Sequence, residues 1–169
     1  MKVPEGWNIR KLEELASIER GKFSVRPRND PRYFGGSMPF VQTGDITSSN
    51  MFLYHYTQTL NDEGIAVSKV FPKDTILITI AANIGDTAIT TFEVACTDSV
   101  VAICPNSGQT DVYWLKNVLE TKKGDLDAQS TQNAQKNINL QVLRPLLLAT
   151  PSLPEQQKIA QILSTWDKA

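Results

Sequence analysis

Residues 70–89 have the sequence VFPKDTILITIAANIGDTAI, and this stretch decides the class of fold. Its centre, TILITI at residues 75–80, is rich in β-branched side chains and follows the turn-like sequence PKD at residues 72–74. A second turn-like sequence, NIGD, occupies residues 83–86, and AITTF follows it at residues 88–92. We therefore predict two β-strands joined by a turn.

Further strand signals occur on both sides of this stretch. Residues 40–42 (FVQ) are a short candidate strand closed by a turn at Gly44-Asp45, and residues 98–103 are another candidate. Residues 140–148 are apolar but contain Pro145, which has no backbone N–H to donate within a sheet. For this segment we predict a short helical turn followed by an edge strand.

Two other segments have helical periodicity. Residues 11–18 (KLEELASI) space their apolar side chains as a short amphipathic helix does. Residues 111–123 form a second candidate helix, in which Asp111 is suited to cap the N-terminus and Gly124 to end the helix. Short strands combined with short helices indicate an α+β domain.

The last predicted helix differs from the others. It follows the break TPSLP at residues 150–154, and Pro154 suits its first turn. Its apolar side chains recur at intervals of three and four residues: Ile159, Ile162, Leu163 and Trp166. This stripe reaches Ala169 without a cap, so we expect a longer helix that packs on another helix; the alternative is a helix folded back on its own domain.

Length and composition indicate one globular domain. The chain has 169 residues, of which 41% are hydrophobic and 21% charged, and its net charge is −1. The charge is distributed unevenly: residues 1–36 have eight basic and five acidic side chains, residues 37–115 two and eight, and residues 116–169 seven and five. A polyanionic partner would therefore bind the ends of the sequence and not its middle.

Sequence motifs of common enzyme classes are missing. The sequence contains no GxGxxG, GxxxxGK[ST], GxSxG or HExxH motif. The single histidine, His55, lies between Tyr54 and Tyr56, with no metal ligands at a suitable spacing. We therefore predict no catalytic activity, no metal site and no cofactor.

The sequence also favours a cytoplasmic protein without a membrane span. Its first residues, MKVPEGW, do not resemble a signal peptide, and no apolar run approaches the ~20 residues of a membrane helix. Cys96 and Cys104 both lie beside apolar residues, so we predict two buried, reduced thiols on strands.

Two polar segments are candidates for ligand recognition. Residues 20–32 have the strongest basic excess, and four of their side chains can contact phosphates: Lys22, Arg26, Arg28 and Arg32. Residues 128–139 (AQSTQNAQKNIN) supply amides that can pair with the edges of bases. The simpler alternatives are a solvated turn for the first segment and an amide-rich loop that caps the next element for the second.

Several stretches together resemble a target recognition domain of a type I restriction–modification specificity subunit. They are VPEGWNIRKLEELASIERG (3–21), YFGGSMPFVQTGDI (33–46), residues 70–89, TQNAQKNIN (131–139) and LLATPSLPEQQKIAQIL (147–163). The resemblance covers essentially the whole chain. It implies an α+β recognition domain over residues 1–150, with a curved, mostly antiparallel sheet and short flanking helices, and the start of a long spacer helix over residues 151–169.

The resemblance also implies function and partners. Such a domain binds one half of a bipartite target in double-stranded DNA and has no active site. A methyltransferase subunit then methylates adenine, and a motor-nuclease subunit cleaves unmodified DNA. The C-terminal helix would join a second recognition domain or a second copy of the chain. Met1 and the Gly6-Trp7 segment favour a separate subunit over the recognition domain of a fused restriction–methylation enzyme.

These expectations assign roles to individual residues. The basic segment would contact phosphates. Polar side chains in loops would contact bases: Gln42, Thr43, Asn83, Gln129, Ser130, Thr131, Gln132 and Asn133. A third group would hold the protein or DNA backbone: Gln135, Lys136 and Asn137. Residues 96–99 (CTDS) depart from the family pattern, in which many members have an Asn-Gln pair, so no role is transferred to them. The alternative from another class is a module that binds protein or glycan.

Overall fold

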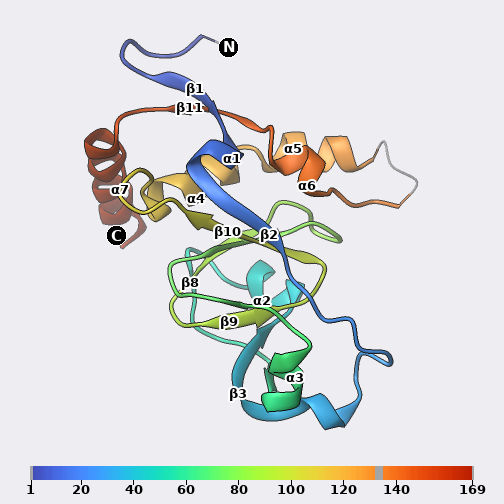
Figure 1. Ribbon diagram of the computed structural model, residues 1–169. Helices are drawn as coiled ribbons and strands as arrows, with labels where there is room; N and C mark the ends of the chain where they lie inside the picture. Colours follow the sequence, from blue (N-terminus) through green and yellow to red (C-terminus); the bar gives the residue numbers. More distant parts are fainter. Residues whose placement is uncertain (1, 132–134, 169) are drawn as a thin grey trace.

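The computed structural model describes residues 2–131 and 135–168, and it arranges their strands in three sheets (Figure 1). The central sheet has five strands, in the spatial order β2 (Ala16–Arg20), β10 (Val100–Pro105), β7 (Ile76–Thr79), β8 (Thr87–Thr90) and β4 (Phe52–Leu53). Its pairs are antiparallel except for β4 with β8. The predicted strands within residues 70–89 are the β7–β8 hairpin, so this part of the sequence was interpreted correctly.

Strand β7 is buried on both faces. Ile76 and Ile78 pack in one hydrophobic cluster with helices on one side of the sheet, while Leu77 packs in a second cluster on the other side. A strand covered on both faces needs apolar side chains at successive positions and not only at alternate ones. This requirement explains the three successive apolar residues Ile76, Leu77 and Ile78 within the TILITI sequence.

A second sheet lies at the lower end of Figure 1 and supports much of the candidate site. Its four strands are, in spatial order, β5 (Gln58–Leu60), β3 (Phe34–Val41), β9 (Val94–Cys96) and β6 (Val70–Phe71). Three short helical elements adjoin it in the sequence: the 3-10 helix η1 (Pro31–Tyr33), α2 (Thr43–Thr47) and α3 (Asp62–Ala66). Phe23, Phe40, Leu60 and Ala95 form a small hydrophobic cluster against this sheet.

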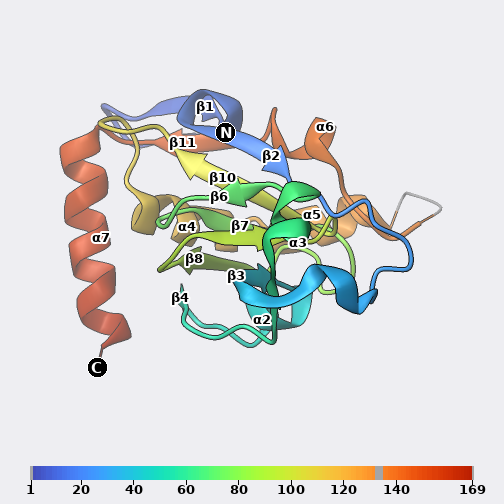
Figure 2. The same ribbon diagram turned by 60° about the horizontal axis from the view of Figure 1, so that its bottom comes forward.

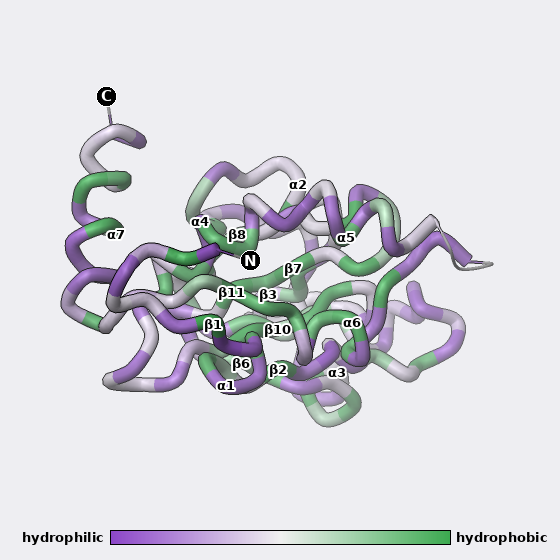
Figure 3. Tube along the Cα trace, turned by 90° about the horizontal axis from the view of Figure 1, so that it is seen from above, coloured by the Kyte–Doolittle hydropathy of each residue, from purple (hydrophilic) through white to green (hydrophobic). Residues whose placement is uncertain are grey.

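The remaining elements of the described residues are a small sheet that joins the two ends of the sequence and five helices. Strands β1 (Asn8–Lys11) and β11 (Leu147–Thr150) pair antiparallel. The helices are α1 (Leu12–Leu15), α4 (Val112–Thr121), α5 (Lys123–Ser130), α6 (Leu140–Leu143) and α7 (Leu153–Asp167). Helix α7 packs on α4 at one side of the molecule (Figures 1 and 2). Figure 3 shows apolar residues concentrated in the central strands and polar residues in the outer loops.

Several predicted elements are confirmed. The α+β class is confirmed, as is the short helix followed by an edge strand at α6 and β11. The Asp111 carboxylate caps α4 by accepting a hydrogen bond from the Trp114 backbone N–H at 2.8 Å. Both cysteines are free and lie on strands, although Cys104 is only half-buried.

Other boundaries were wrong. Only Leu12–Leu15 of the predicted helix over residues 11–18 is helical, because residues from Ala16 onward pair with β10, with Ile18 opposite Ile103. The Gly44-Asp45 turn is part of α2. Gly124 does not end a helix, because α5 continues to Ser130 with Leu126 fully buried in the core. Strand β9 was not predicted.

Candidate nucleic-acid interface

The basic segment at residues 20–32 is fixed at its base. Gly21 lies so close to β9 that an added Cβ would be 2.1 Å from the Thr97 carbonyl oxygen, so only glycine fits there. The Phe23 side chain is 5% exposed, and its ring centroid is 4.9 Å from that of Phe40 and 6.2 Å from that of Tyr33. The buried ring anchors the loop, while the side chains of Lys22, Arg26 and Arg28 are exposed.

Two of the arginines share one acidic partner. The Arg28 Nη2 atom is 3.2 Å from Asp98 Oδ2, and the Arg26 Nη2 atom is 3.9 Å from the same oxygen. The Arg20 side chain donates a hydrogen bond to the Asp98 carbonyl oxygen. Asp98 therefore contacts three arginines of the basic segment, two through its carboxylate and one through its backbone carbonyl.

Arg32 has different partners. Its guanidinium carbon lies 4.6 Å from the centroid of the Tyr33 ring, and its Nη2 donates a hydrogen bond to the Tyr33 hydroxyl. Its Nε atom also lies 3.8 Å from Glu63 Oε2. The hydrogen bond to Tyr33 is the main reason that the pKa of Arg32 is raised, so this side chain stays positively charged.

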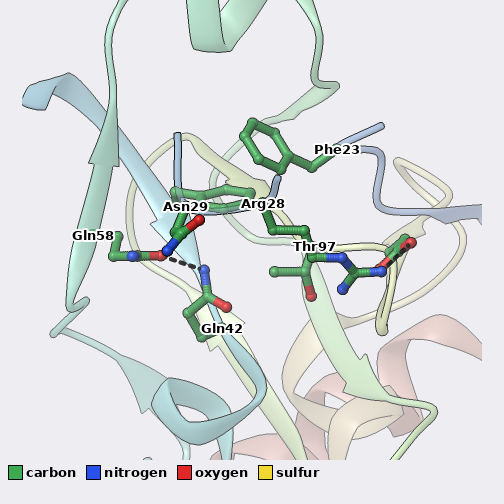
Figure 4. Close-up of a pocket in the computed structure, with 8 residues that line it drawn as sticks. Phe23, Arg28, Asn29, Gln42, Gln58 and Thr97 are labelled. Atoms are coloured by element: carbon green, nitrogen blue, oxygen red, sulfur yellow. Dashed lines mark hydrogen bonds and ion pairs between the residues drawn. The ribbon is translucent and has the colours of Figure 1, made fainter. Parts of the chain in front are cut away.

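A pocket of about 200 Å³ opens beside the basic segment (Figure 4). Phe23 and Phe40 supply its apolar lining, and its polar lining comes from Arg28, Asn29, Gln42, Gln58, Thr97 and Asp98. The Gln42 Nε2 atom donates a hydrogen bond of 2.7 Å to Gln58 Oε1. Amide, guanidinium and carboxylate groups thus meet around one cavity that can accept a planar polar group.

Gln42 lines the pocket beside the basic segment, and the structure adds residues that the sequence did not identify. Thr43 follows Gln42 as the first residue of α2 and is half-buried. Asn29, Gln58, Thr97 and Asp98 were missed. The departure from the family pattern at residues 96–99 could have identified Thr97 and Asp98 as candidate site residues. No local sequence pattern distinguishes Gln58.

A second group of candidate residues surrounds the β7–β8 turn. Asn83 is exposed and has a φ of 41°, and its carbonyl oxygen accepts a hydrogen bond of 2.7 Å from Thr79 Oγ1. Ala81 forms a β-bridge with Asn137, and the Ile138 backbone N–H donates to the Ile80 carbonyl oxygen at 2.9 Å. The structure therefore brings Asn83 close to the end of the amide-rich segment.

The amide-rich segment divides into parts with different environments. Gln129 is exposed near the end of α5, but Ser130 is 0% exposed and donates to the Asp127 carbonyl oxygen at 2.6 Å. Burial contradicts the expectation that Ser130 contacts bases from a loop. Thr131 is exposed. Gln132 and Asn133 lie outside the described residues.

The residues after this gap are exposed or half-buried. Gln135 and Lys136 are exposed, and Asn137 is half-buried. Lys136 Nζ lies 3.8 Å from Asp127 Oδ1. The basic segment and helices α5 and α6 all lie on the side of the molecule away from α7 in Figures 1 and 2.

Helix α7 has a partly exposed apolar stripe. Ile162 is 52% exposed and Trp166 is 74% exposed, while Ile159 and Leu163 are half-buried. The Tyr113 hydroxyl of α4 donates a hydrogen bond to the Asp167 carboxylate. Burial and this hydrogen bond raise the pKa of Tyr113 to about 12. The helix thus contacts its own domain and still exposes two large apolar side chains.

No group of side chains in residues 2–131 and 135–168 has the composition of a metal site. His55 is exposed. Among the same residues, no helix has the length and apolar character needed to cross a membrane.

The chain belongs to the family of type I restriction modification DNA specificity domains, whose model matches residues 4–169. It is similar to the type I restriction enzyme MjaIX specificity subunit of Methanocaldococcus jannaschii, with 26% identity over 98% of this chain and 39% of the relative. The chain thus spans about two-fifths of that relative.

Solved structures share the fold. The HsdS subunit from Thermoanaerobacter tengcongensis superposes with a TM-score of 0.76 at 21% identity, over 99% of this chain and 39% of that one. A chain from a structure on complex assembly and conformational transition of the type I R-M system has a TM-score of 0.80 at 21% identity, over 99% and 40%. At this identity the likeness concerns the fold.

Proposed function

We propose that the chain recognises one half of a bipartite target in double-stranded DNA, as a specificity subunit or part of one in a type I restriction–modification complex. The observation that carries this proposal is the group of exposed arginines beside an amide-lined pocket, in a chain that belongs to this family. Arginine side chains bind phosphates, and amides form paired hydrogen bonds with base edges.

The two sites would have different roles. Lys22, Arg26, Arg28 and Arg32 contact phosphates and fix the register of the domain on the duplex. Gln42 and Thr43 contact bases from one side, and Asn83, Gln129 and Thr131 from the other. Gln135, Lys136 and Asn137 hold the backbone of the protein or of the DNA. A good paired base contact gives about 1–3 kcal/mol of discrimination.

The chain itself would catalyse no reaction. It directs adenine methylation by a methyltransferase subunit and cleavage by a motor-nuclease subunit, all in the cytoplasm where the DNA lies. Residues 1–150 form the recognition domain, and residues 151–169 begin a helix that joins a second recognition domain or a second copy. The exposed side chains of Ile162 and Trp166 support this role for α7.

The decisive experiment is the triple variant R26A/R28A/R32A, tested for binding to duplex DNA across a range of salt concentrations. Loss of three phosphate contacts makes the dependence of log K on log salt less steep by up to about 2.7, since a fully formed contact contributes about 0.9. The control K2A/K158A/K168A removes the same charge from exposed positions outside the candidate site. Equal slopes for the two variants exclude the basic segment from the interface, and no DNA binding by the unaltered chain favours a protein- or glycan-binding module.

A further inference from the structure

Asp98 holds an unusual position in the candidate site. It lies two residues after the end of β9 and lines the same pocket as the hydrogen-bonded Gln42–Gln58 pair. Its carboxylate lies within 4 Å of two guanidinium groups of the basic segment, and its side chain is 31% exposed. The two arginines are 55% exposed.

Stability does not account for this arrangement. Ion pairs between partly exposed side chains are screened by water and contribute little to folding. The basic segment is already anchored by the buried Phe23 ring and by the close packing of Gly21 on Thr97. The main effect of Asp98 is therefore electrostatic, because one negative charge offsets part of the positive charge of Arg26 and Arg28.

We infer that Asp98 is a specificity-determining residue that competes with DNA phosphates for Arg26 and Arg28. This inference rests on the proposed function, in which these arginines contact the DNA backbone. A carboxylate and a phosphate bind the same N–H groups of a guanidinium. A phosphate that binds the Nη2 side of either guanidinium must therefore displace Asp98 from it.

The consequence is selectivity. Phosphate contacts give affinity to any sequence, whereas contacts within the pocket depend on the bases. Asp98 reduces the affinity that comes from phosphate contacts. It leaves the amides of Gln42 and Gln58 in place for the contacts that depend on the bases. Random DNA is thus bound less tightly, and the ratio of specific to non-specific affinity rises.

The test compares D98N with E63Q. Both remove one negative charge beside the basic segment, but among the described residues the ion pair of Glu63 is with Arg32, which Tyr33 still holds after the substitution. The measurement is the affinity of the 169-residue chain for a random-sequence duplex of about 30 base pairs between 50 and 200 mM salt. Thermal unfolding of each variant shows that the fold is retained.

D98N should bind the random duplex more tightly than the unaltered chain at low salt. Its salt dependence should be steeper by up to about 0.9 for each arginine released, because Asp98 weakens the phosphate contacts of the unaltered chain without abolishing them. Release of both arginines steepens the slope by at most about 1.8, which is at most about a 12-fold greater loss of affinity between 50 and 200 mM salt. E63Q should change the slope by clearly less. In selection from a random duplex pool, D98N should enrich fewer base positions.

A slope for D98N equal to that of E63Q overturns the inference, whatever the affinity. That result leaves the proposed function intact if R26A/R28A/R32A still weakens binding. If the unaltered chain does not bind DNA, the proposed function fails and the inference fails with it. The same conclusion follows if the triple variant binds DNA as tightly as the unaltered chain. The two failures are therefore distinguishable.

Discussion

Replacing Phe23 with alanine should destabilise the protein by about 3 kcal/mol, at the lower end of the cost of truncating a buried phenylalanine. The ring is nearly fully buried and lies within 6.2 Å, centroid to centroid, of the Tyr33, Phe34 and Phe40 rings. The lower end applies because this cluster is small and lies beneath a surface loop that can partly close over the cavity. For 169 residues the entropy of unfolding is about 350 cal/mol/K, so Tm should fall by about 8 °C.

The assay is thermal unfolding followed by circular dichroism, with Y54A as the matched control. Tyr54 is 63% exposed, and its ring contacts only Phe52 among the described aromatic pairs, at 6.0 Å. Its truncation should shift Tm by about 1–2 °C, in line with surface substitutions of about 0.5 kcal/mol. F23L should lie between the two. A Tm for F23A within 2 °C of the unaltered protein would refute the view that this ring anchors the basic segment.

Two further predictions concern buried polar groups. Gln156 is 1% exposed and accepts a hydrogen bond of 2.9 Å from the Asp111 backbone N–H. Q156A should therefore lower the free energy of unfolding, measured with denaturant, by about 1–3 kcal/mol. The control is Q157A, which removes the exposed neighbouring side chain and should leave the free energy of unfolding unchanged. Burial raises the pKa of the Cys96 thiol to about 12 from an ordinary value of 9.0. Between pH 9 and pH 12 the folded state therefore keeps the thiol proton, whereas the unfolded state loses it. The contribution of Cys96 to the free energy of unfolding is fully present below pH 9 and declines as the pH rises toward 12. Unfolding titrations of C96A should show a smaller decline over that interval, and an identical decline would contradict the assignment.

The sequence predicted those elements whose local signals agree with their tertiary environment. The apolar run at β7 indicated a strand, and it is a strand because both of its faces are buried. Asp111 was identified as a cap because capping depends on residues only three positions apart. Residues 16–18 were assigned to a helix because their apolar spacing fits one, but pairing with β10 outweighs that preference.

The candidate site was predicted only in part, because its geometry depends on distant contacts. Arg26 and Arg28 stood out by charge, yet their shared partner Asp98 lies about 70 positions later in the sequence. Gln42 and Gln58 meet because β3 and β5 pair with Phe40 opposite Gln58. Composition cannot reveal such registers. The amide-rich segment was interpreted as a loop, but its first residues belong to α5 because Leu126 is drawn into the core.

Helix α7 and the basic segment lie on opposite sides of one framework of buried strands (Figure 2). The start of α7 is held by Gln156, whose Nε2 donates to the Pro151 carbonyl oxygen, and by the cap residue of α4. None of these contacts includes a residue of the basic segment or of its pocket. Surface loops at one end can therefore be exchanged during evolution while the way in which α7 packs on α4 is inherited unchanged.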